Sequence, residues 1–334
     1  MEEQIIENKP LSASRIKLLE DCSWLYYCKY HLNLPDTSNL GAKSGTICHL
    51  IFEILLNPRH LKNYKRIVAA KTIDGDKGVS RLVKKHILKE NIDSPENYIL
   101  IDQMILTGLT TDFFVKGKKG EKVELLGAEL EFNIKNEDPA YHIKGFIDKP
   151  HKVGKRIIID DYKSSKAKFE GEDKESNIQG MMYSLASLKT WPEYEPEVRF
   201  IFLRFPDDPI VKIKFNKDIL KGFESYLAYI QKIVNNFGEE DARANFAFDQ
   251  TDKEGFKGKL MCGFAKCAGE KKKDGTPKWS CQYKFPFKYY VLKNAEGKTL
   301  KSSFENNFKP KEGEKVLELF YTGCPAHRPI IDEF

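Results

Sequence analysis

The chain has 334 residues, of which 41% are hydrophobic and 31% are charged. A chain of this length can bury a substantial core, and it predicts roughly two domains of an ordinary globular kind. Lysine and arginine exceed aspartate and glutamate by 55 to 49, so the net charge of +6 permits a polyanionic partner without demonstrating one. The acidic opening residues do not resemble a secretory signal, and about 18 consecutive apolar residues occur nowhere. We therefore expect a soluble, intracellular protein without a membrane association.

The first 120 residues have the pattern of a helical region. Apolar side chains at helical spacing predict two helices between residue 11 and about residue 57, with Ser12 or Ser14 capping the first and the second starting near Ser44. The residues that follow are rich in lysine and mostly helical in pattern. The segments DGDKG near 74 and GKKGEK near 117 interrupt them.

The pattern changes at about Glu121, where three short β-rich runs follow one another: VELLGAELEFNI, YHIKGFID and RIIIDDYK. We expect the last two to pair through the short turn PHKVGK. A helix is predicted at about 176–189, then a hairpin of VRFIFLRF and IVKIKF, and then a helix at about 217–236. This order of elements predicts an α/β core.

Charged side chains concentrate near the ends of two predicted strands. Because side chains alternate along a strand, Asp161 and Lys163 share one face, whereas Asp160 and Tyr162 point the other way. Asp148, at the end of the preceding strand, could complete a pair of carboxylates that suits Mg2+ or Mn2+. Lys163 beside such an ion would orient the attacking water and offset charge on the phosphate. A lone DYK is more often a strand with a cross-strand salt bridge, so the assignment depends on the surrounding motifs.

Three ordered segments, GFID, IIIDDYK and IQGMMYSLA, resemble the core motifs of the PD-(D/E)XK nucleases of the RecB type. The resemblance implies an α/β, restriction-endonuclease-like fold in which helices flank a central mixed sheet. It also implies hydrolysis of phosphodiester bonds by a metal-activated water. The residues that it assigns are the metal ligands Asp148 and Asp161, the backbone carbonyl of Tyr162 as a further ligand, the catalytic Lys163, and Gln179 and Tyr183, which would support the site or contact DNA.

The N-terminal region extends this resemblance. SASRIKLLEDCSWLYYCKY is similar to the segment that opens these proteins, and GTICHLIFE is similar to their G-x-x-x-H-x-x-x-E helix. His49 and Glu53 are four residues apart on one helical face, and the resemblance implies that His49 is an additional metal ligand. Without the downstream motifs, His49 would be interpreted as a packed histidine on an apolar helix. Glu129 and Glu131 share a strand face where the family often has a glutamate, so Glu131 is a further candidate ligand.

The seven cysteines cluster near the two ends of the chain. In a cytosolic protein, such clusters favour metal binding over disulfides. A subset of the RecB-type nucleases, which includes AddB-like and CRISPR-associated members, holds an iron-sulfur cluster with one cysteine before the core and three after it. By that resemblance, a [4Fe-4S] cluster would use Cys22, Cys262, Cys267 and Cys281, with Cys324 as an alternative ligand.

The spacing of the late cysteines departs from that pattern, because the family pattern contains CxxC whereas Cys262 and Cys267 are spaced C-x4-C. A Zn2+ site on the four late cysteines is the alternative, and unliganded thiols are the third interpretation. Cys28 and Cys48 are interpreted as small, buried apolar residues.

These observations predict three parts: a helical region of residues 1–120 that contributes His49 and Cys22, a nuclease core of residues 121–240, and a cysteine-rich module of residues 241–334. The predicted function is a Mg2+- or Mn2+-dependent deoxyribonuclease. Single-stranded DNA or duplex ends are the expected substrate, and an exonuclease is the subtype that the resemblance favours. A helicase or recombination protein is an expected partner, in DNA repair or recombination.

Two alternative functions compete with this one. A non-catalytic DNA-binding or repair-complex subunit could retain the fold, but it should have lost a ligand, and none is lost here. A small-molecule phosphohydrolase or other unrelated α/β enzyme finds no support, because the sequence contains no Walker loop, no GxSxG and no GxGxxG.

Overall fold

The computed structural model describes residues 8–115, 117, 121–244 and 281–325. The chain divides into two compact units. The first comprises Met1–Ala13 and Ser38–Lys232, and the second comprises Ser14–Thr37 and Ile233–Phe334. This grouping differs from the three predicted parts, because residues 14–37 belong with the C-terminal part of the chain. Within the described ranges, every helix is too short or too polar to cross a membrane.

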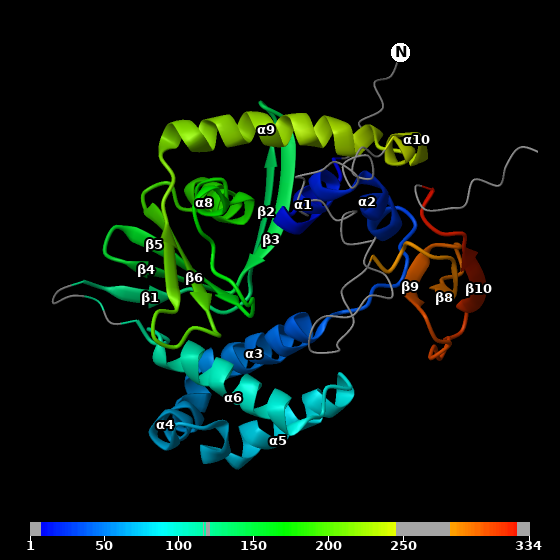
Figure 1. The fold of residues 1–334 in the computed structure, drawn as a ribbon. Coiled ribbons are helices and arrows are strands. Elements are labelled where there is room, and N and C mark those ends of the chain that lie inside the picture. Colours follow the sequence, from blue (N-terminus) through cyan, green and yellow to red (C-terminus); the bar gives the residue numbers. More distant parts are fainter. Residues whose placement is uncertain (1–7, 116, 118–120, 245–280, 326–334) are drawn as a thin grey trace, which may run out of the picture. The chain divides into compact units, whose positions relative to one another are not determined.

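A five-stranded mixed sheet forms the centre of the first unit (Figure 1). Its order is β1-β4-β5-β6-β7, and the bounds are Val123–Leu125, Lys149–Val153, Arg156–Lys163, Glu195–Phe202 and Ile210–Ile213. β5 and β6 are parallel, whereas the other neighbours are antiparallel. Two parallel strands that follow each other in the chain need a crossover connection. The connection from β5 to β6 contains the short α7 (Glu172–Glu175) and then α8 (Ile178–Thr190), which packs against β6. The predicted fold class and the hairpin of β6 and β7 are confirmed.

A separate hairpin of β2 (Leu130–Asn136) and β3 (Tyr141–Ile147) corrects one predicted pairing. The run YHIKGFID does not pair with RIIIDDYK, because β3 pairs with β2 and β5 pairs with β4. Most of the predicted turn is itself strand β4. Gly154, with a φ of +59°, allows a tight turn between β4 and β5 that leaves the preceding residues extended. Asp148 therefore lies where the chain leaves β3 and enters β4.

Four helices precede the sheet in the first unit: α3 (Leu40–Leu56), α4 (Leu61–Ala70), α5 (Lys77–Lys89) and α6 (Pro95–Thr110). Short 3-10 helices, Pro58–His60 and Ile73–Gly75, connect them. α3 begins earlier than the predicted start near Ser44. The side chain of Asn39 accepts a hydrogen bond of 2.9 Å from the backbone N–H of Ala42, and this cap fixes the first turn.

The buried face of α3 anchors it in the first unit. Ile47, Ile51 and Leu55 recur at helical spacing and are at most 1% exposed. A Cβ atom on Gly108 of α6 would lie 2.2 Å from the ring of Phe52, so the close approach of α3 and α6 requires glycine at that position. α3 also packs against β5. The helix therefore contacts both α6 and the central sheet.

Asp76 caps α5 from a position that is only 3% exposed. Its Oδ1 atom accepts hydrogen bonds from the backbone N–H groups of Gly78, at 3.0 Å, and Val79, at 3.2 Å. Its Oδ2 atom accepts from Asn63 Nδ2 at 2.8 Å and from the guanidinium of Arg66 at 3.2 Å. Burial acts to raise the pKa of Asp76, but these hydrogen bonds outweigh it and keep the pKa below its usual value.

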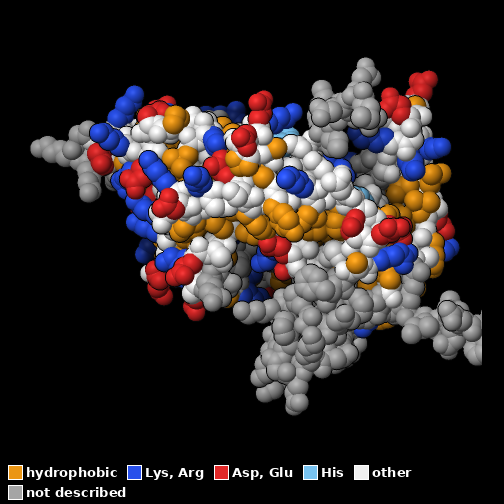
Figure 2. Space-filling model, turned by 90° about the horizontal axis from the view of Figure 1, so that it is seen from above, with side chains coloured by type: hydrophobic (Ala, Val, Ile, Leu, Met, Phe, Trp, Pro, Cys, Tyr) orange, Lys and Arg blue, Asp and Glu red, His pale blue; other side chains and the backbone are white. Residues whose placement is uncertain are grey.

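α9 (Lys217–Asn236) has the predicted bounds and buries Leu220, Phe223 and Leu227. It also exposes apolar side chains, among them Ile219 and Tyr229. Figure 2 shows the face seen from above, where positive and negative side chains are interspersed and hydrophobic side chains form a band. Among the described residues of this face, neither sign of charge forms a patch of its own.

The second unit combines short helices with a small sheet. The helices are α1 (Ala13–Asp21), of which Ser14 onward belongs to this unit, α2 (Ser23–Tyr30) and α10 (Glu239–Arg243). The antiparallel sheet has the order β10-β8-β9, with bounds Lys315–Tyr321, Phe287–Lys293 and Thr299–Ser303. The hydroxyl of Tyr321 joins the two parts, because it accepts from Trp24 Nε1 at 2.8 Å and donates to the carbonyl of Tyr283 at 3.0 Å.

Candidate active site

Asp161 and Lys163 lie on one face at the end of β5, as the alternation predicts. Lys163 Nζ lies 2.6 Å from Asp161 Oδ2 and donates to Gln179 Oε1 at 2.6 Å. From α8, Gln179 Nε2 donates to Asp161 Oδ1 at 2.9 Å, and the hydroxyl of Tyr183 lies 2.9 Å from the same oxygen. The structure therefore brings these four predicted site residues together. Their contacts hold the Asp161 carboxylate, which is only 2% exposed, in one orientation.

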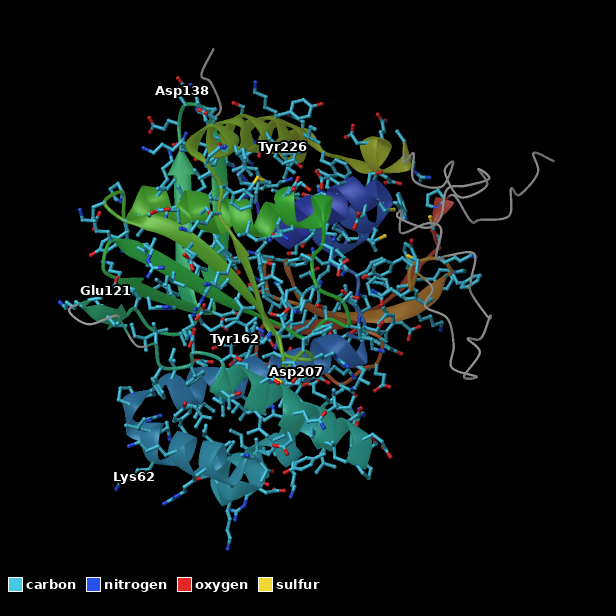
Figure 3. The ribbon with its side chains drawn as sticks, turned by 60° about the vertical axis from the view of Figure 1, so that its left-hand side comes forward. Lys62, Glu121, Asp138, Tyr162, Asp207 and Tyr226 are labelled. Carbon is cyan, nitrogen blue, oxygen red and sulfur yellow. The ribbon has the colours of Figure 1, made fainter. Side chains whose placement is uncertain are left out.

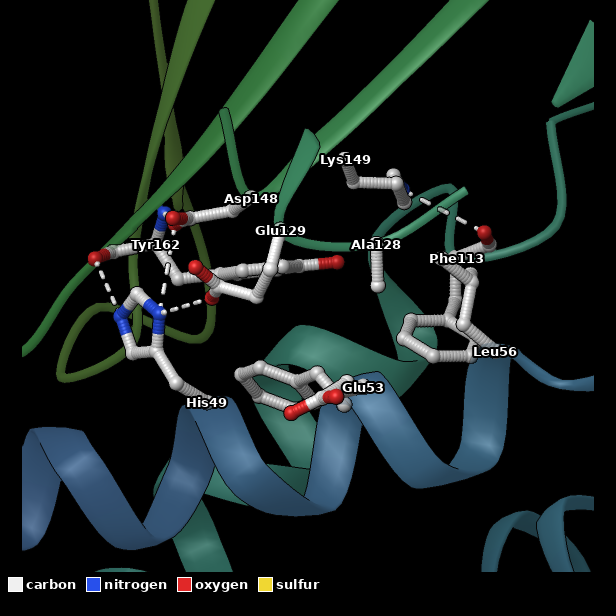
Figure 4. A pocket seen from close by; sticks show the side chains of 10 residues that line it. His49, Glu53, Leu56, Phe113, Ala128, Glu129, Asp148, Lys149 and Tyr162 are labelled. Carbon is white, nitrogen blue, oxygen red and sulfur yellow. Dashed lines mark hydrogen bonds and ion pairs between the residues drawn. The ribbon is translucent and has the colours of Figure 1, made fainter. Parts of the chain in front are cut away.

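A second group of polar side chains lies beside this one. His49, Glu129 and Asp148 each offer a ligand atom, and these atoms all lie within 4.8 Å of one another. His49 Nδ1 is 3.6 Å from Glu129 Oε1 and 3.5 Å from Asp148 Oδ2. Figure 4 shows His49 extending from α3 toward both carboxylates. We name these three residues the ligand cluster.

The backbone of Tyr162 links two members of the ligand cluster. Its N–H donates to Asp148 Oδ2 at 2.8 Å, and its carbonyl oxygen lies 3.1 Å from His49 Nε2. If Nε2 carries the ring proton and donates to this carbonyl, the lone pair on Nδ1 faces the carboxylates of the ligand cluster. The ring of Tyr162 is buried against Phe52 of α3, with 4.3 Å between ring centroids. Figure 3 shows Tyr162 where the central sheet approaches the helical part of the first unit.

The two glutamates that the sequence offered have different surroundings. Glu129 belongs to the ligand cluster, whereas Glu131 forms an ion pair of 2.6 Å with Lys144 on the surface of the β2–β3 hairpin. Glu129 also precedes β2 and has a φ of +50°, a conformation that costs a non-glycine residue of the order of 1 kcal/mol or more. Its backbone N–H donates to the carbonyl of Asp148 at 3.0 Å. The strand pattern alone could not distinguish the two, because it placed both on one face.

The ligand cluster strongly perturbs its own protonation. Burial acts to lower the pKa of His49, but its hydrogen bond with Glu129 and the charges of Asp148 and Asp161 outweigh burial and raise the pKa to about 9. For Asp148, burial and then the charge of Asp161 raise the pKa to about 7, although His49 acts in the opposite direction. Closely spaced, desolvated acids of this kind are stabilised when a cation replaces their protons.

The donor atoms fit a divalent cation. One imidazole nitrogen and two carboxylates suit Mn2+, and the carboxylate oxygens together with water suit Mg2+. The carbonyl of Tyr162 borders the ligand cluster through His49. Asp161 lies close enough to influence the pKa of both His49 and Asp148, while its oxygens contact Lys163, Gln179 and Tyr183.

An open groove of about 370 Å3 leads away from His49 along α3. Small side chains line it, namely Ala42, Gly45 and Thr46 of α3 and Ser164 just after β5. The first turns of α3 approach the end of β5 closely, because Ser164 donates from its hydroxyl to the carbonyl of Gly41 at 3.0 Å. The groove gives an extended ligand access to the ligand cluster from one side.

The opposite face of β5 carries a buried ionic network that the sequence did not indicate. Asp160 is fully buried, and its carboxylate contacts Lys149 Nζ at 2.7 Å and the guanidinium of Arg199 at 2.6 and 2.9 Å. Lys149 Nζ also donates to the carbonyls of Asp112, at 3.1 Å, and Phe113, at 3.3 Å. Lys149 directly follows Asp148, and Asp160 directly precedes Asp161. The network therefore ties together the strands that position both acids.

In the second unit, Cys28 and Cys281 each lie within electrostatic range of Cys22 and Cys324. Burial is the main cause that raises the pKa of Cys28 to about 12 and that of Cys281 to about 11, and the neighbouring thiols add to it. Cys28 also donates to the hydroxyl of Tyr321 at 3.6 Å. The predicted ligands Cys262 and Cys267 lie outside the described residues.

Comparison with known proteins adds the family. A search of the curated proteins finds no match. Among solved structures, the chain is similar to a crystal structure from Eubacterium rectale named "Putative exonuclease", with 12% identity, a TM-score of 0.44, and coverage of 68% of this chain and 81% of that one. The model of the PD-(D/E)XK nuclease superfamily matches residues 10–283, which include the ligand cluster, Asp161 and Lys163. Because this match spans most of the chain, the protein belongs to the PD-(D/E)XK nuclease superfamily.

Proposed function

We propose that this protein is a Mg2+- or Mn2+-dependent deoxyribonuclease. The observation that carries the proposal is that His49, Glu129 and Asp148 direct ligand atoms to within 4.8 Å of one another, next to the paired Asp161 and Lys163. The ligand cluster would hold the cation, with Asp161 and the carbonyl of Tyr162 as the further ligands that the sequence motifs suggest. A bound cation would supply positive charge for the phosphate and would make water more acidic.

The protein's own side chains have separable tasks in this proposal. Lys163 keeps its ammonium partly exposed at the end of β5, where it can donate to a phosphate oxygen and to the attacking water. Gln179 positions Lys163 and Asp161 together, since it accepts from one and donates to the other. Tyr183 lies at hydrogen-bond distance from both Asp161 and the carbonyl of Phe146. It thereby ties α8 to the strand that leads into Asp148.

We further propose a RecB- or AddB-like exonuclease that acts on single-stranded DNA or duplex ends, together with a helicase or recombination protein, in repair or recombination. The order of the motifs from Cys22 to Tyr183 supports this subtype. The open groove along α3 is compatible with a single strand that reaches the ligand cluster from one side. Co-purification from cells with and without DNA damage tests the partner.

Cleavage of end-labelled DNA tests the activity. Single- and double-stranded substrates are incubated with Mg2+, Mn2+ or EDTA, and the native chain is compared with Asp161→Ala and Lys163→Ala. We expect metal-dependent cutting that each substitution reduces at least 100-fold, because each removes charge from the site of phosphoryl chemistry.

Asp207→Ala and Lys212→Ala are the matched controls, since both side chains are exposed in the first unit, and they should cut like the native chain. Cutting in EDTA, or unchanged rates in both site variants, would contradict the proposal. Binding of DNA without any cutting would favour a non-catalytic DNA-binding subunit instead.

We also propose that the second unit binds a metal through cysteines, as a [4Fe-4S] cluster or as Zn2+. Cys22 and Cys324 both act on the pKa of Cys281 although the three residues are far apart in sequence, and this proximity supports the proposal. Such a site would join distant segments and add to the stability of this unit. A [4Fe-4S] cluster would use Cys22, Cys262, Cys267 and Cys281, with Cys324 as an alternative ligand. Zn2+ would use the four late cysteines, Cys262, Cys267, Cys281 and Cys324.

Metal analysis of protein purified without oxygen distinguishes these possibilities. A brown protein with iron and sulfide supports the cluster, and stoichiometric zinc supports the alternative. Protein that contains neither iron nor zinc would contradict a thiolate site. Cys281→Ala should lower the metal content, whereas Cys48→Ala should not, because Cys48 is buried in the core of the first unit.

A further inference from the structure

The outward face of the β2–β3 hairpin leads directly to the ligand cluster. Side chains alternate along both strands, so Glu131 and Phe146 share this face. Glu129 directly precedes β2 and Asp148 directly follows β3, and both belong to the ligand cluster. Phe146 is paired across the hairpin with Glu131, one step before Glu129 and Asp148. It therefore lies about two residues, or roughly 7 Å of extended chain, from Asp148.

Phe146 is unusual for the surface on which it lies. The other residues of this hairpin face are charged or polar, namely Glu131, Asn133 and Lys135 on β2 and His142 and Lys144 on β3. The side chain of Phe146 is nevertheless 50% exposed. The apolar residues of the hairpin lie on the other face, where Phe132, Ile143 and Ile147 are buried. An apolar ring that the fold does not bury is available to a ligand.

The backbone of Phe146 is fixed with respect to the site. The hydroxyl of Tyr183 lies 3.0 Å from the carbonyl oxygen of Phe146 and 2.9 Å from Asp161 Oδ1. Gly145 allows the strand to approach the ring of Phe132, because a Cβ atom there would lie 2.6 Å from that ring. The exposed ring of Phe146 is therefore carried by a backbone whose position is linked to that of Asp161.

The charges around Phe146 permit a polyanion to approach it. Glu131 is its cross-strand neighbour and would repel a phosphate backbone, but Lys144 Nζ lies 2.6 Å from the carboxylate of Glu131 and offsets its charge. Proteins bind single strands by stacking bases on aromatic side chains and by placing positive charge near the phosphates. The exposed ring of Phe146, beside an ion pair and next to a candidate cation site, has both features.

We propose that Phe146 is a stacking platform for a nucleobase adjacent to the scissile phosphate, so that the site takes an unpaired base. The inference rests on the proposed nuclease function and deepens it by naming the side chain that contacts the unpaired base. A base within a duplex is already stacked on both faces, whereas an unpaired base can stack on the ring without that cost. Phe146 positions the substrate and does not touch the reacting atoms.

The test compares Phe146→Ala, Phe146→Tyr and the control Tyr229→Ala, which truncates an exposed aromatic side chain on α9. For cleavage of single-stranded DNA, we expect Phe146→Ala to raise KM about tenfold, the scale of one base–aromatic stack, with a smaller change in kcat. Phe146→Tyr and Tyr229→Ala should keep the native KM. Unfolding temperatures of all variants should match that of the native chain, because both side chains are exposed.

A second measurement separates stacking from a structural role. Oligonucleotides with 2-aminopurine or an abasic residue at each position near the cut are bound to the native chain and to Phe146→Ala, both carrying Lys163→Ala to prevent cutting. Quenching of 2-aminopurine at one position should be lost with Phe146→Ala, and an abasic residue there should abolish the difference in affinity.

An unchanged KM, or an equal loss on normal and abasic DNA, overturns the stacking role while leaving the nuclease intact. If the native chain neither binds nor cuts DNA, the proposed function fails, and the stacking role fails with it.

Discussion

At the scale of single residues, Glu129 and Glu131 provide a matched pair. Glu129 lies in the ligand cluster, and Glu131 forms a surface ion pair with Lys144. We expect Glu129→Gln to weaken Mn2+ binding at least tenfold, measured by calorimetric titration, and to reduce cleavage in parallel, because it removes a charged ligand. Glu131→Gln should bind Mn2+ like the native chain. The reverse ranking would place the cation on the other glutamate.

Asp76 makes a prediction about pH. Its pKa is lowered in the folded protein, so its charged form stabilises the fold above the pKa of the unfolded chain, about 3.9, and this contribution is lost as the pH falls through the folded value. We expect Asp76→Ala to lower the free energy of unfolding by about 1–2 kcal/mol at pH 7. The difference from the native chain should shrink below about pH 4.

Urea denaturation at pH 7 and pH 3 measures this difference. Asp93→Ala is the control, since this exposed aspartate precedes α6 without being its cap. A difference that is constant over this range would show that the cap acts through geometry and not through its charge.

At the scale of elements, β5 carries two adjacent aspartates with different surroundings. Asp160 is fully buried between Lys149 and Arg199, so its loss removes the carboxylate that these two buried cations share. We expect Asp160→Ala to lower the free energy of unfolding by about 3–5 kcal/mol, measured by urea denaturation. Asp207→Ala, on the exposed loop after β6, should change it by less than about 0.5 kcal/mol. A small effect of Asp160→Ala would show that the network is not needed for the fold.

The sequence predicted the residues of the site better than the pairing of the strands. Alternation along RIIIDDYK correctly grouped Asp161 with Lys163, and helical spacing placed Gln179 and Tyr183 on one face. The pairing of β4 with β5 was missed because KPHKV contains proline and two lysines, which weaken the strand pattern. β4 can still form a buried strand because Lys149 forms an ion pair with the buried Asp160.

Other features depend on contacts that local patterns do not contain. Glu129 enters the ligand cluster through a backbone with positive φ, which no periodicity encodes. The sequence pattern singled out neither Lys149, next to the predicted turn, nor Arg199, in a predicted strand, because only the sheet register places them beside Asp160. The three C-terminal strands were likewise not predicted, since turns and charged residues interrupt them.

At the scale of the whole molecule, the two compact units predict independent contributions to stability. Asp76 stabilises the first unit, and a thiolate site would stabilise the second. We expect the losses from Asp76→Ala and Cys281→Ala to add within about 0.5 kcal/mol in the double variant, because distant sites without shared partners behave independently. Calorimetric unfolding of the single and double variants measures this. A large deviation from additivity would mean that the two sites are energetically coupled.

Tyr162 offers a spectroscopic view of the site. Its N–H is bound to the Asp148 carboxylate, and its carbonyl lies at hydrogen-bond distance from the His49 imidazole. The peptide unit before Tyr162 therefore contacts Asp148, and the peptide unit after it lies next to His49. In protein labelled with 15N-tyrosine and 13C-tyrosine, the amide resonance of Tyr162 would report the charge on Asp148, and its carbonyl resonance would report the state of His49. In a titration with diamagnetic Mg2+, movement of both resonances would show that both residues respond to the ion, and movement of only one would identify the residue that does.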